Sequence, residues 1–195
     1  MSSLIYIRKN PFNLMMALAL MGSVIIFFVL SLAFFSRLYA PDWQSFKLPM
    51  YFWLSTVVMV ISSGALWQAT NQFKLENYER YKNWLAVTLI LGIIFLAMQA
   101  AGAYEMWAGG IKWQHISGAF LFLLGGLHAA HILGGLIWMI VIYFQAIRKR
   151  TYVDNFIQSL NPLTSIRLKL LGWYWHFVDG LWLYLFLVFL VSNAF

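Results

Sequence analysis

Four side chains that can bind a metal or move a proton fall within two long apolar stretches of this sequence. His128 and His131 stand three residues apart in one stretch, and His176 and Asp179 stand three residues apart in another. On a helix, this spacing puts the two members of a pair on neighbouring parts of one face. Because imidazole and carboxylate groups coordinate metals and exchange protons near neutral pH, a metal site, a proton relay and a buried hydrogen-bond network are all chemically open.

The residue types favour the hydrogen-bond network. Two haem ligands must approach the iron from opposite sides, so His128 and His131 cannot clamp one haem between them. The chain has four histidines and no cysteine, which excludes thiolate zinc sites, iron–sulfur clusters and covalently attached haem. A relay through the membrane lacks a second carboxylate beside Asp179 within the predicted spans. We therefore expect His128, His131, His176 and Asp179 to form a buried polar network without a metal.

Membrane-spanning helices must position these side chains. The chain of 195 residues is 63% hydrophobic and 10% charged, whereas about a quarter of the residues in an ordinary soluble domain are charged. Crossing the hydrocarbon core takes roughly 20 apolar residues. Five stretches without Lys or Arg are long enough: 12–35, 50–69, 83–104, 116–147 and 170–191. We predict an all-α bundle of five transmembrane helices that forms a single membrane domain over residues 1–195.

The basic residues predict the orientation of this bundle. If the N-terminus is cytoplasmic, only three of the 13 Lys and Arg residues, Arg37, Lys47 and Lys112, lie outside. Basic residues collect in short cytoplasmic loops, so we expect a cytoplasmic N-terminus and a periplasmic C-terminus. The same distribution argues against a nucleic-acid partner. The segment from Arg148 to Lys169 contains Asn161-Pro162 and is predicted to be a surface loop with a turn.

Two further features are candidates for structural roles. Gly126, Ala130 and Gly134 stand at four-residue spacing, which predicts a helix face where two backbones approach closely. Glu105 follows Tyr104 at the end of a span and is a weak functional candidate, because a carboxylate at the membrane interface is usually just hydrated.

Two motifs resemble cytochrome c oxidase subunit III. Residues 173–179, Trp-Tyr-Trp-His-Phe-Val-Asp, followed by Trp182, resemble the family signature WYWHFVD..W. Residues 126–132, Gly-Leu-His-Ala-Ala-His-Ile, are similar to the family's G-x-H-G-x-H-V, and residues 135–139 resemble the form seen in bacterial quinol oxidases. Gln99-Ala100 and Tyr104-Glu105 fit the family pattern Q-A-S-E-Y-Y-E in part. The resemblance covers all five predicted spans, as in the short bacterial form.

Two positions depart from the family pattern. The family has an acidic residue in a Ser-Glu-Val context where this chain has Gly22-Ser23-Val24, and Gly102 stands where the family has the glutamate of Q-A-S-E-Y. Both changes favour a scaffold and lipid-binding role over direct proton handling.

The resemblance implies a non-catalytic subunit III of a respiratory haem–copper terminal oxidase in the bacterial inner membrane. Such a subunit docks against oxidase subunits I and II, which hold the haems and copper, and it has no redox cofactor of its own. It binds structural phospholipids in a cleft, stabilises subunit I and supports proton uptake during oxygen reduction. In this setting Arg148, Lys149 and Arg150 are candidate contacts for anionic lipid headgroups. A larger respiratory supercomplex is a further partner that the resemblance allows.

Four other functions stay open from the sequence. They are the accessory membrane subunit of a nitric oxide reductase, a quinol oxidase subunit III, a haem-bearing quinol-oxidising subunit, and a small transporter that uses the same His and Asp residues. The electron donor is not encoded here, because that choice is made in subunits I and II. A transporter would favour inverted repeats or broken helices, and the sequence has neither signal.

Overall fold

Five long helices form the computed structural model, which describes residues 11–39, 43, 46–148 and 162–193. Each helix is long and apolar enough to cross a membrane. In chain order they are α2 (Pro11–Ser36), α3 (Met50–Lys74), α4 (Tyr78–Ala108), α5 (Ile116–Ile147) and α7 (Pro162–Ser192). No strand occurs within the described ranges. The all-α membrane bundle predicted from the apolar stretches is therefore confirmed.

The helices extend beyond the apolar stretches where polar side chains permit it. α4 begins at Tyr78 because the Asn77 side chain accepts a hydrogen bond from the backbone N–H of Arg80 at 3.3 Å, which caps the helix. α7 begins at Pro162, and proline suits the first position of a helix, where its missing N–H costs nothing. Residues 162–169 are therefore helical, which corrects the expectation of a loop up to Lys169. Residues 149–161 lie outside the described part of the chain.

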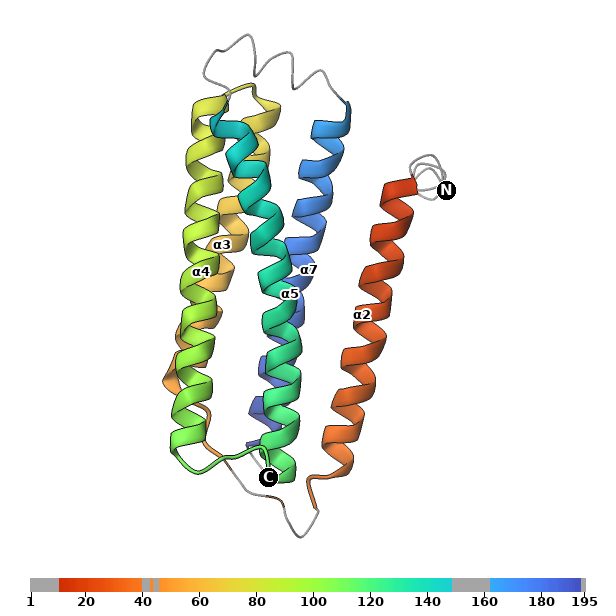
Figure 1. The fold of residues 1–195 in the computed structure, drawn as a ribbon, viewed down its shortest axis with the longest axis vertical. Helices are drawn as coiled ribbons and strands as arrows, with labels where there is room; N and C mark the ends of the chain where they lie inside the picture. Colours follow the sequence, from red (N-terminus) through yellow and green to blue (C-terminus); the bar gives the residue numbers. More distant parts are fainter. Residues whose placement is uncertain (1–10, 40–42, 44–45, 149–161, 194–195) are drawn as a thin grey trace.

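Four helices form the bundle, and α2 stands beside it. α3, α4, α5 and α7 pack around a common core, whereas α2 meets α5 and α7 near its own C-terminal end and diverges from them towards its N-terminal end (Figure 1). In the most apolar window of each helix, 56% of α7 is buried but only 17% of α2. α7 is thus the central helix and α2 the peripheral one.

Large aromatic side chains fill the core around α7. Trp182 is fully buried, and its ring packs edge-on against Phe52 of α3 and Phe95 of α4, with ring centroids 5.6 and 5.5 Å apart. The Trp182 Nε1–H donates to Thr56 Oγ1 of α3 at 3.0 Å. Because this contact satisfies the only polar atom of the side chain, Trp182 can join three helices without an unpaired donor.

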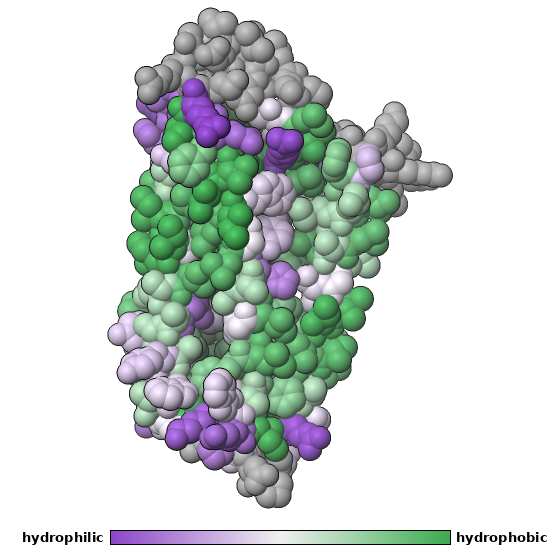
Figure 2. All heavy atoms as spheres, viewed as in Figure 1, coloured by the Kyte–Doolittle hydropathy of each residue, from purple (hydrophilic) through white to green (hydrophobic). Residues whose placement is uncertain are grey.

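The outer surface is apolar between two polar ends. On the face drawn in Figure 2, hydrophobic residues occupy most of the middle of the molecule, and most of the strongly hydrophilic residues lie near its two ends. Large hydrophobic side chains such as Ile25, Val29 and Ile137 are more than half exposed. An apolar belt of this kind is what contact with lipid requires.

Close helix approach occurs at Gly135 instead of at the predicted stripe. A Cβ on Gly135 would lie 2.9 Å from a ring carbon of Tyr174 and 3.2 Å from the Trp175 ring. Gly126, Ala130 and Gly134 are instead exposed, and a Cβ on Gly126 would meet no atom within 4 Å. The three small residues lie on one side of α5, as their four-residue spacing predicts, but this side of α5 faces outward. The stripe therefore makes no close contact within the described part of this chain, and the close approach of two helix backbones there stays a prediction.

Candidate functional site

His131 joins α5 to α2. Its Nδ1 lies 2.8 Å from the backbone oxygen of Leu127, and its Nε2 lies 3.2 Å from Ser23 Oγ. A carbonyl oxygen only accepts, so Nδ1 carries a proton, and in the neutral ring Nε2 accepts from the Ser23 hydroxyl. The ring of Phe27 packs edge-on against His131 with centroids 5.6 Å apart. His131 is therefore used at the contact with α2 and points away from the core of the bundle.

Ser23 stands where the resemblance described above implies an acidic residue. Its hydroxyl lies 3.1 Å from the backbone oxygen of Ala19 as well as 3.2 Å from His131. A hydroxyl has one proton to donate, so these two acceptors share it. Ser23 thus forms a helix-to-helix hydrogen bond at this position.

His176 and Asp179 are linked through α3. His176 Nδ1 lies 2.7 Å from Ser63 Oγ, and the Ser63 side chain also interacts with the carboxyl group of Asp179. His176 is exposed on the outside of the bundle near the middle of α7, whereas Asp179 is 8% exposed. One serine therefore connects a side chain on the outer surface to a carboxyl group in the core.

His128 is enclosed by aromatic rings. It is 1% exposed, it stacks on Trp182 with centroids 5.4 Å apart and planes 27° apart, and the edge of Phe95 lies against it. Neither ring nitrogen of His128 has a hydrogen-bond partner among the described residues, and the same holds for Asp179 Oδ2. Both side chains line one small cavity in the middle of the bundle. The structure thus places His128 beside Asp179 without a direct bond between them.

The four residues of the predicted polar network fall into two groups. His176, Asp179 and His128 lie along one line of contacts through the core, whereas His131 faces α2. Among the described residues, no three His, Cys, Asp or Glu side chains gather in the way that a metal ion would need.

A cleft separates α2 from the bundle at the end that holds the N-terminus of α2. Its volume is about 740 Å³, and α2, α5 and α7 line it: Phe12, Met15, Met16, Ala19, Trp138, Val141, Ile142, Gln145, Leu163, Ile166, Arg167 and Leu170. Most of these side chains are apolar, and one cation, Arg167, lies among them. An apolar cleft with a cation near the membrane surface suits a lipid with a negatively charged headgroup.

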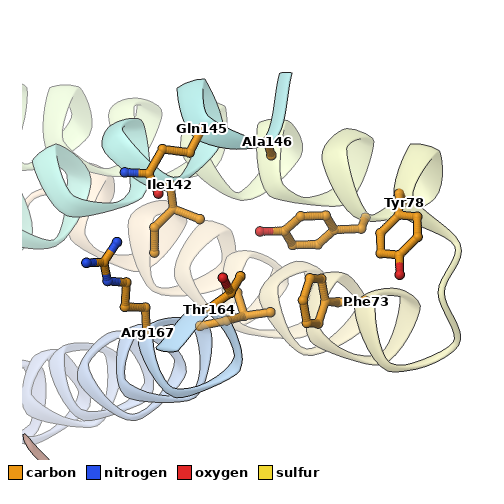
Figure 3. Close-up of a pocket in the computed structure, with 9 residues that line it drawn as sticks. Phe73, Tyr78, Ile142, Gln145, Ala146, Thr164 and Arg167 are labelled. Carbon is orange, nitrogen blue, oxygen red and sulfur yellow. The ribbon is translucent and has the colours of Figure 1, made fainter. Parts of the chain in front are cut away.

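Arg167 separates this cleft from a smaller pocket inside the bundle. Figure 3 shows Arg167 extending from α7 towards Gln145 of α5, with Phe73 and Thr164 further along the pocket. The smaller pocket has a volume of about 30 Å³ and shares Ile142, Gln145 and Arg167 with the cleft. The guanidinium group therefore lies where the polar end of the cleft meets the bundle.

The remaining predicted residues lie at the helix ends. Arg148 directly follows α5 and is exposed, three residues beyond Gln145 of the cleft. Lys149 and Arg150 lie outside the described residues. Glu105 is exposed in the last turn of α4.

The contacts of three residues were not predicted from the sequence. Ser63 and Ser23 bind the histidines, and Arg167 lines the cleft. Serine is common at helix contacts in membranes, so the Ser62-Ser63-Gly64 run in the middle of a predicted span was a usable signal. From the sequence alone, Arg167 is only one of the basic residues that predict the orientation, because a hydropathy window does not show that it lies on a helix.

Comparison with known proteins identifies relatives for nearly the whole chain. A profile of the family described as "Cytochrome c oxidase subunit III" matches residues 5–193. A probable cytochrome c oxidase subunit 3 of Rickettsia felis is 30% identical over 134 residues, which cover 68% of this chain and 45% of the relative. A cytochrome c oxidase subunit 3 of Rhipicephalus sanguineus is 26% identical over 192 residues, covering 91% of this chain and 69% of the relative.

A quinol oxidase subunit is among the matches. The cytochrome bo(3) ubiquinol oxidase subunit 3 of Pseudomonas putida is 34% identical over 108 residues, covering 54% of this chain and 47% of the relative. The chain spans about half the length of the first curated relatives that it matches.

Proposed function

The chain belongs to the cytochrome c oxidase subunit III family, and we propose that it serves as the subunit III of a respiratory haem–copper oxidase. In this role it docks against the catalytic subunit in a bacterial inner membrane, binds phospholipid and contains no redox centre of its own. The N-terminus is cytoplasmic and the C-terminus periplasmic. Its contribution to proton uptake is to hold the catalytic subunit in its working geometry.

The observation that carries this proposal is the exposed His176 near the middle of a membrane-spanning helix. An ionisable side chain at this depth is costly against lipid and normally faces protein or water. His176 has one nitrogen on Ser63, and the rest of its ring lies on the outer surface of α3 and α7. Gly180, one turn further along α7, is exposed, and a Cβ there would meet no atom within 4 Å. Such a surface lets the helix of another subunit approach closely and offer a polar group to His176.

The lipid part of the proposal rests on the cleft beside α2. The apolar walls of this cleft match an acyl chain, while Arg167 and the nearby Arg148 match a phosphate-bearing headgroup. Both arginines lie at the end of the bundle that the basic residues predict to be cytoplasmic. We propose that an anionic phospholipid fills the cleft and keeps α2 attached to the bundle.

A quinol oxidase is the second candidate for the parent complex. The relative from Pseudomonas putida carries this name and is the most identical over its aligned segment of the three relatives described above. The two oxidases differ in the electron donor, which acts on other subunits. The partner that binds this chain therefore decides between them.

Photo-cross-linking in native membranes tests the docking surface. A benzophenone amino acid at Leu183, which is 42% exposed on the same side of α7 as His176, should cross-link to the haem-bearing subunit. The same group at Ile25, which is 60% exposed on α2, is the matched control and should react mainly with lipid. Equal cross-linking from both positions, or none from Leu183, would contradict docking through α7.

Native mass spectrometry tests the lipid site. The Arg167→Ala variant should lose at least half of the anionic phospholipid that copurifies with the complex. The Lys112→Ala variant removes one cation at the opposite end of the bundle and should retain it. An unchanged lipid content in Arg167→Ala would refute the assignment of the cleft to an anionic lipid.

A further inference from the structure

We propose that one water molecule occupies the small cavity in the middle of the bundle and joins His128 to Asp179 by hydrogen bonds. The cavity has a volume of about 10 Å³, and its lining comes from α3, α4, α5 and α7: Met59, Ser62, Gly92, Phe95, His128, Ile132, Trp175, Val178 and Asp179. A single buried water needs roughly this volume, measured in the same way. The inference does not depend on the oxidase assignment.

Three polar residues, His128, Asp179 and Ser62, belong to the otherwise apolar lining of the cavity. His128 is 1% exposed with both ring nitrogens unpaired, and Asp179 Oδ2 is buried and unpaired, as judged from the described residues. Ser62 Oγ accepts from Trp175 Nε1–H at 3.2 Å and keeps its own proton for another acceptor. Buried waters typically make about three hydrogen bonds to groups that would otherwise be unpaired. The number and kind of polar groups therefore match one water.

The donors and acceptors balance around such a water. A neutral His128 has one N–H and one nitrogen that accepts, and an ionised Asp179 only accepts. The water donates one proton to Asp179 Oδ2 and one to the unprotonated nitrogen of His128, and it accepts from the Ser62 hydroxyl. Asp179 Oδ2 and one ring nitrogen of His128 then each have a hydrogen-bond partner, and the second ring nitrogen of His128 keeps none among the described residues.

A direct bond between His128 and Asp179 is blocked by the packing of the imidazole ring. Trp182 stacks on one face of the ring, and Phe95 packs against it in a T-shaped arrangement. Because both aromatic residues are buried, the ring cannot swing across the cavity without disturbing the core. A water reaches both groups while the aromatic packing is kept.

The water completes a chain of polar interactions across the bundle. The chain runs from the exposed His176 through Ser63 to Asp179, and from there through the water to His128. It connects α7 and α3 with α5 at mid-membrane depth, where each hydrogen bond lacks competition from bulk water. It ends on a side chain closed in by aromatic rings, so its role is to hold the three helices together.

High-resolution cryo-electron microscopy of the purified complex tests the proposal directly. At a resolution near 2 Å, we expect a density peak within hydrogen-bond distance of both Asp179 Oδ2 and a ring nitrogen of His128. A map of that quality without a peak, or with His128 bonded directly to Asp179, would overturn the proposal.

A cavity-filling variant provides an independent test, because a bound water and a dry cavity predict opposite changes in the midpoint of thermal unfolding. Val178→Ile adds a methylene at a wall of the cavity. If a water is bound, its expulsion leaves His128 and Asp179 unpaired, and the midpoint of thermal unfolding falls by at least about 2–4 °C. The fall should shrink by more than half when His128→Phe is also present, since the imidazole is then gone. An unchanged or raised midpoint for Val178→Ile alone would show a dry cavity and refute the inference.

Discussion

Two neighbouring glycines on α5 should respond oppositely to the same substitution. Gly135 is buried, and a Cβ there would lie 2.9 Å from Tyr174 and 3.2 Å from Trp175. Gly134 is exposed, and a Cβ there would meet only the Tyr174 hydroxyl, at the ordinary contact distance of 3.4 Å. We therefore predict that Gly135→Ala destabilises the chain, while Gly134→Ala leaves it unchanged or makes it slightly more stable.

The neighbours of Gly135 cannot move away freely, because hydrogen bonds hold both rings. The Tyr174 hydroxyl donates to the backbone oxygen of His131 at 2.8 Å, and Trp175 Nε1 donates to Ser62 Oγ at 3.2 Å. Overpacking a filled core costs typically about 1–3 kcal/mol. Alanine gains roughly 0.5–1 kcal/mol over glycine within a helix, and this gain is common to both variants. The two variants should therefore differ by about 1–3 kcal/mol in the free energy of unfolding.

Titration of the chain in mild detergent with sodium dodecyl sulfate measures this difference. The loss of helical circular dichroism gives the free energy of unfolding for the parent chain and for the two variants under one set of conditions. Equal stability of Gly135→Ala and Gly134→Ala, or a less stable Gly134→Ala, would refute the packing of α5 against α7 described here.

Two further substitutions test single hydrogen bonds. Thr56→Val leaves the buried Nε1–H of Trp182 without its acceptor and should cost about 1–3 kcal/mol in the same titration; a loss smaller than that would show that this contact is not formed. Ser23→Ala removes the hydroxyl that binds His131 and should lengthen or broaden the distances between spin labels on α2 and α5. Ser36→Ala is its control, because that hydroxyl bonds only to the backbone of its own helix at 2.8 Å, and matching distance distributions in the two variants would contradict the role of Ser23.

The helices could be predicted because membrane insertion imposes a simple requirement on sequence. Roughly 20 apolar residues without Lys or Arg are needed to cross the hydrocarbon core, and α2 and α5 agree with the predicted spans to within one residue. The start of α7 was missed because Ser165, Arg167 and Lys169 lower the hydropathy of its first two turns. Composition alone does not distinguish a charged helix end from a loop.

The partners of the site residues required the three-dimensional structure. Sequence spacing placed His128 and His131 on neighbouring parts of one face, but helix rotation directs one into the core and the other towards α2. The rotation of α5 about its axis also determines that Gly135 packs against α7, while the stripe that includes Gly134 faces outward. The Ser62-Ser63-Gly64 run indicates a helix contact, but the sequence does not identify His176 as the partner of Ser63, because a serine in a span can also bond to the backbone of its own helix.

The oxidase assignment is tested most directly by purifying the complex through a tag on this chain in mild detergent. We predict that a haem-bearing subunit I and a copper-binding subunit II copurify, that the sample shows haem absorption bands, and that it consumes oxygen with a suitable electron donor. The donor that supports the turnover then distinguishes a cytochrome c oxidase from a quinol oxidase. A colourless chain that purifies without these subunits would contradict the proposed function.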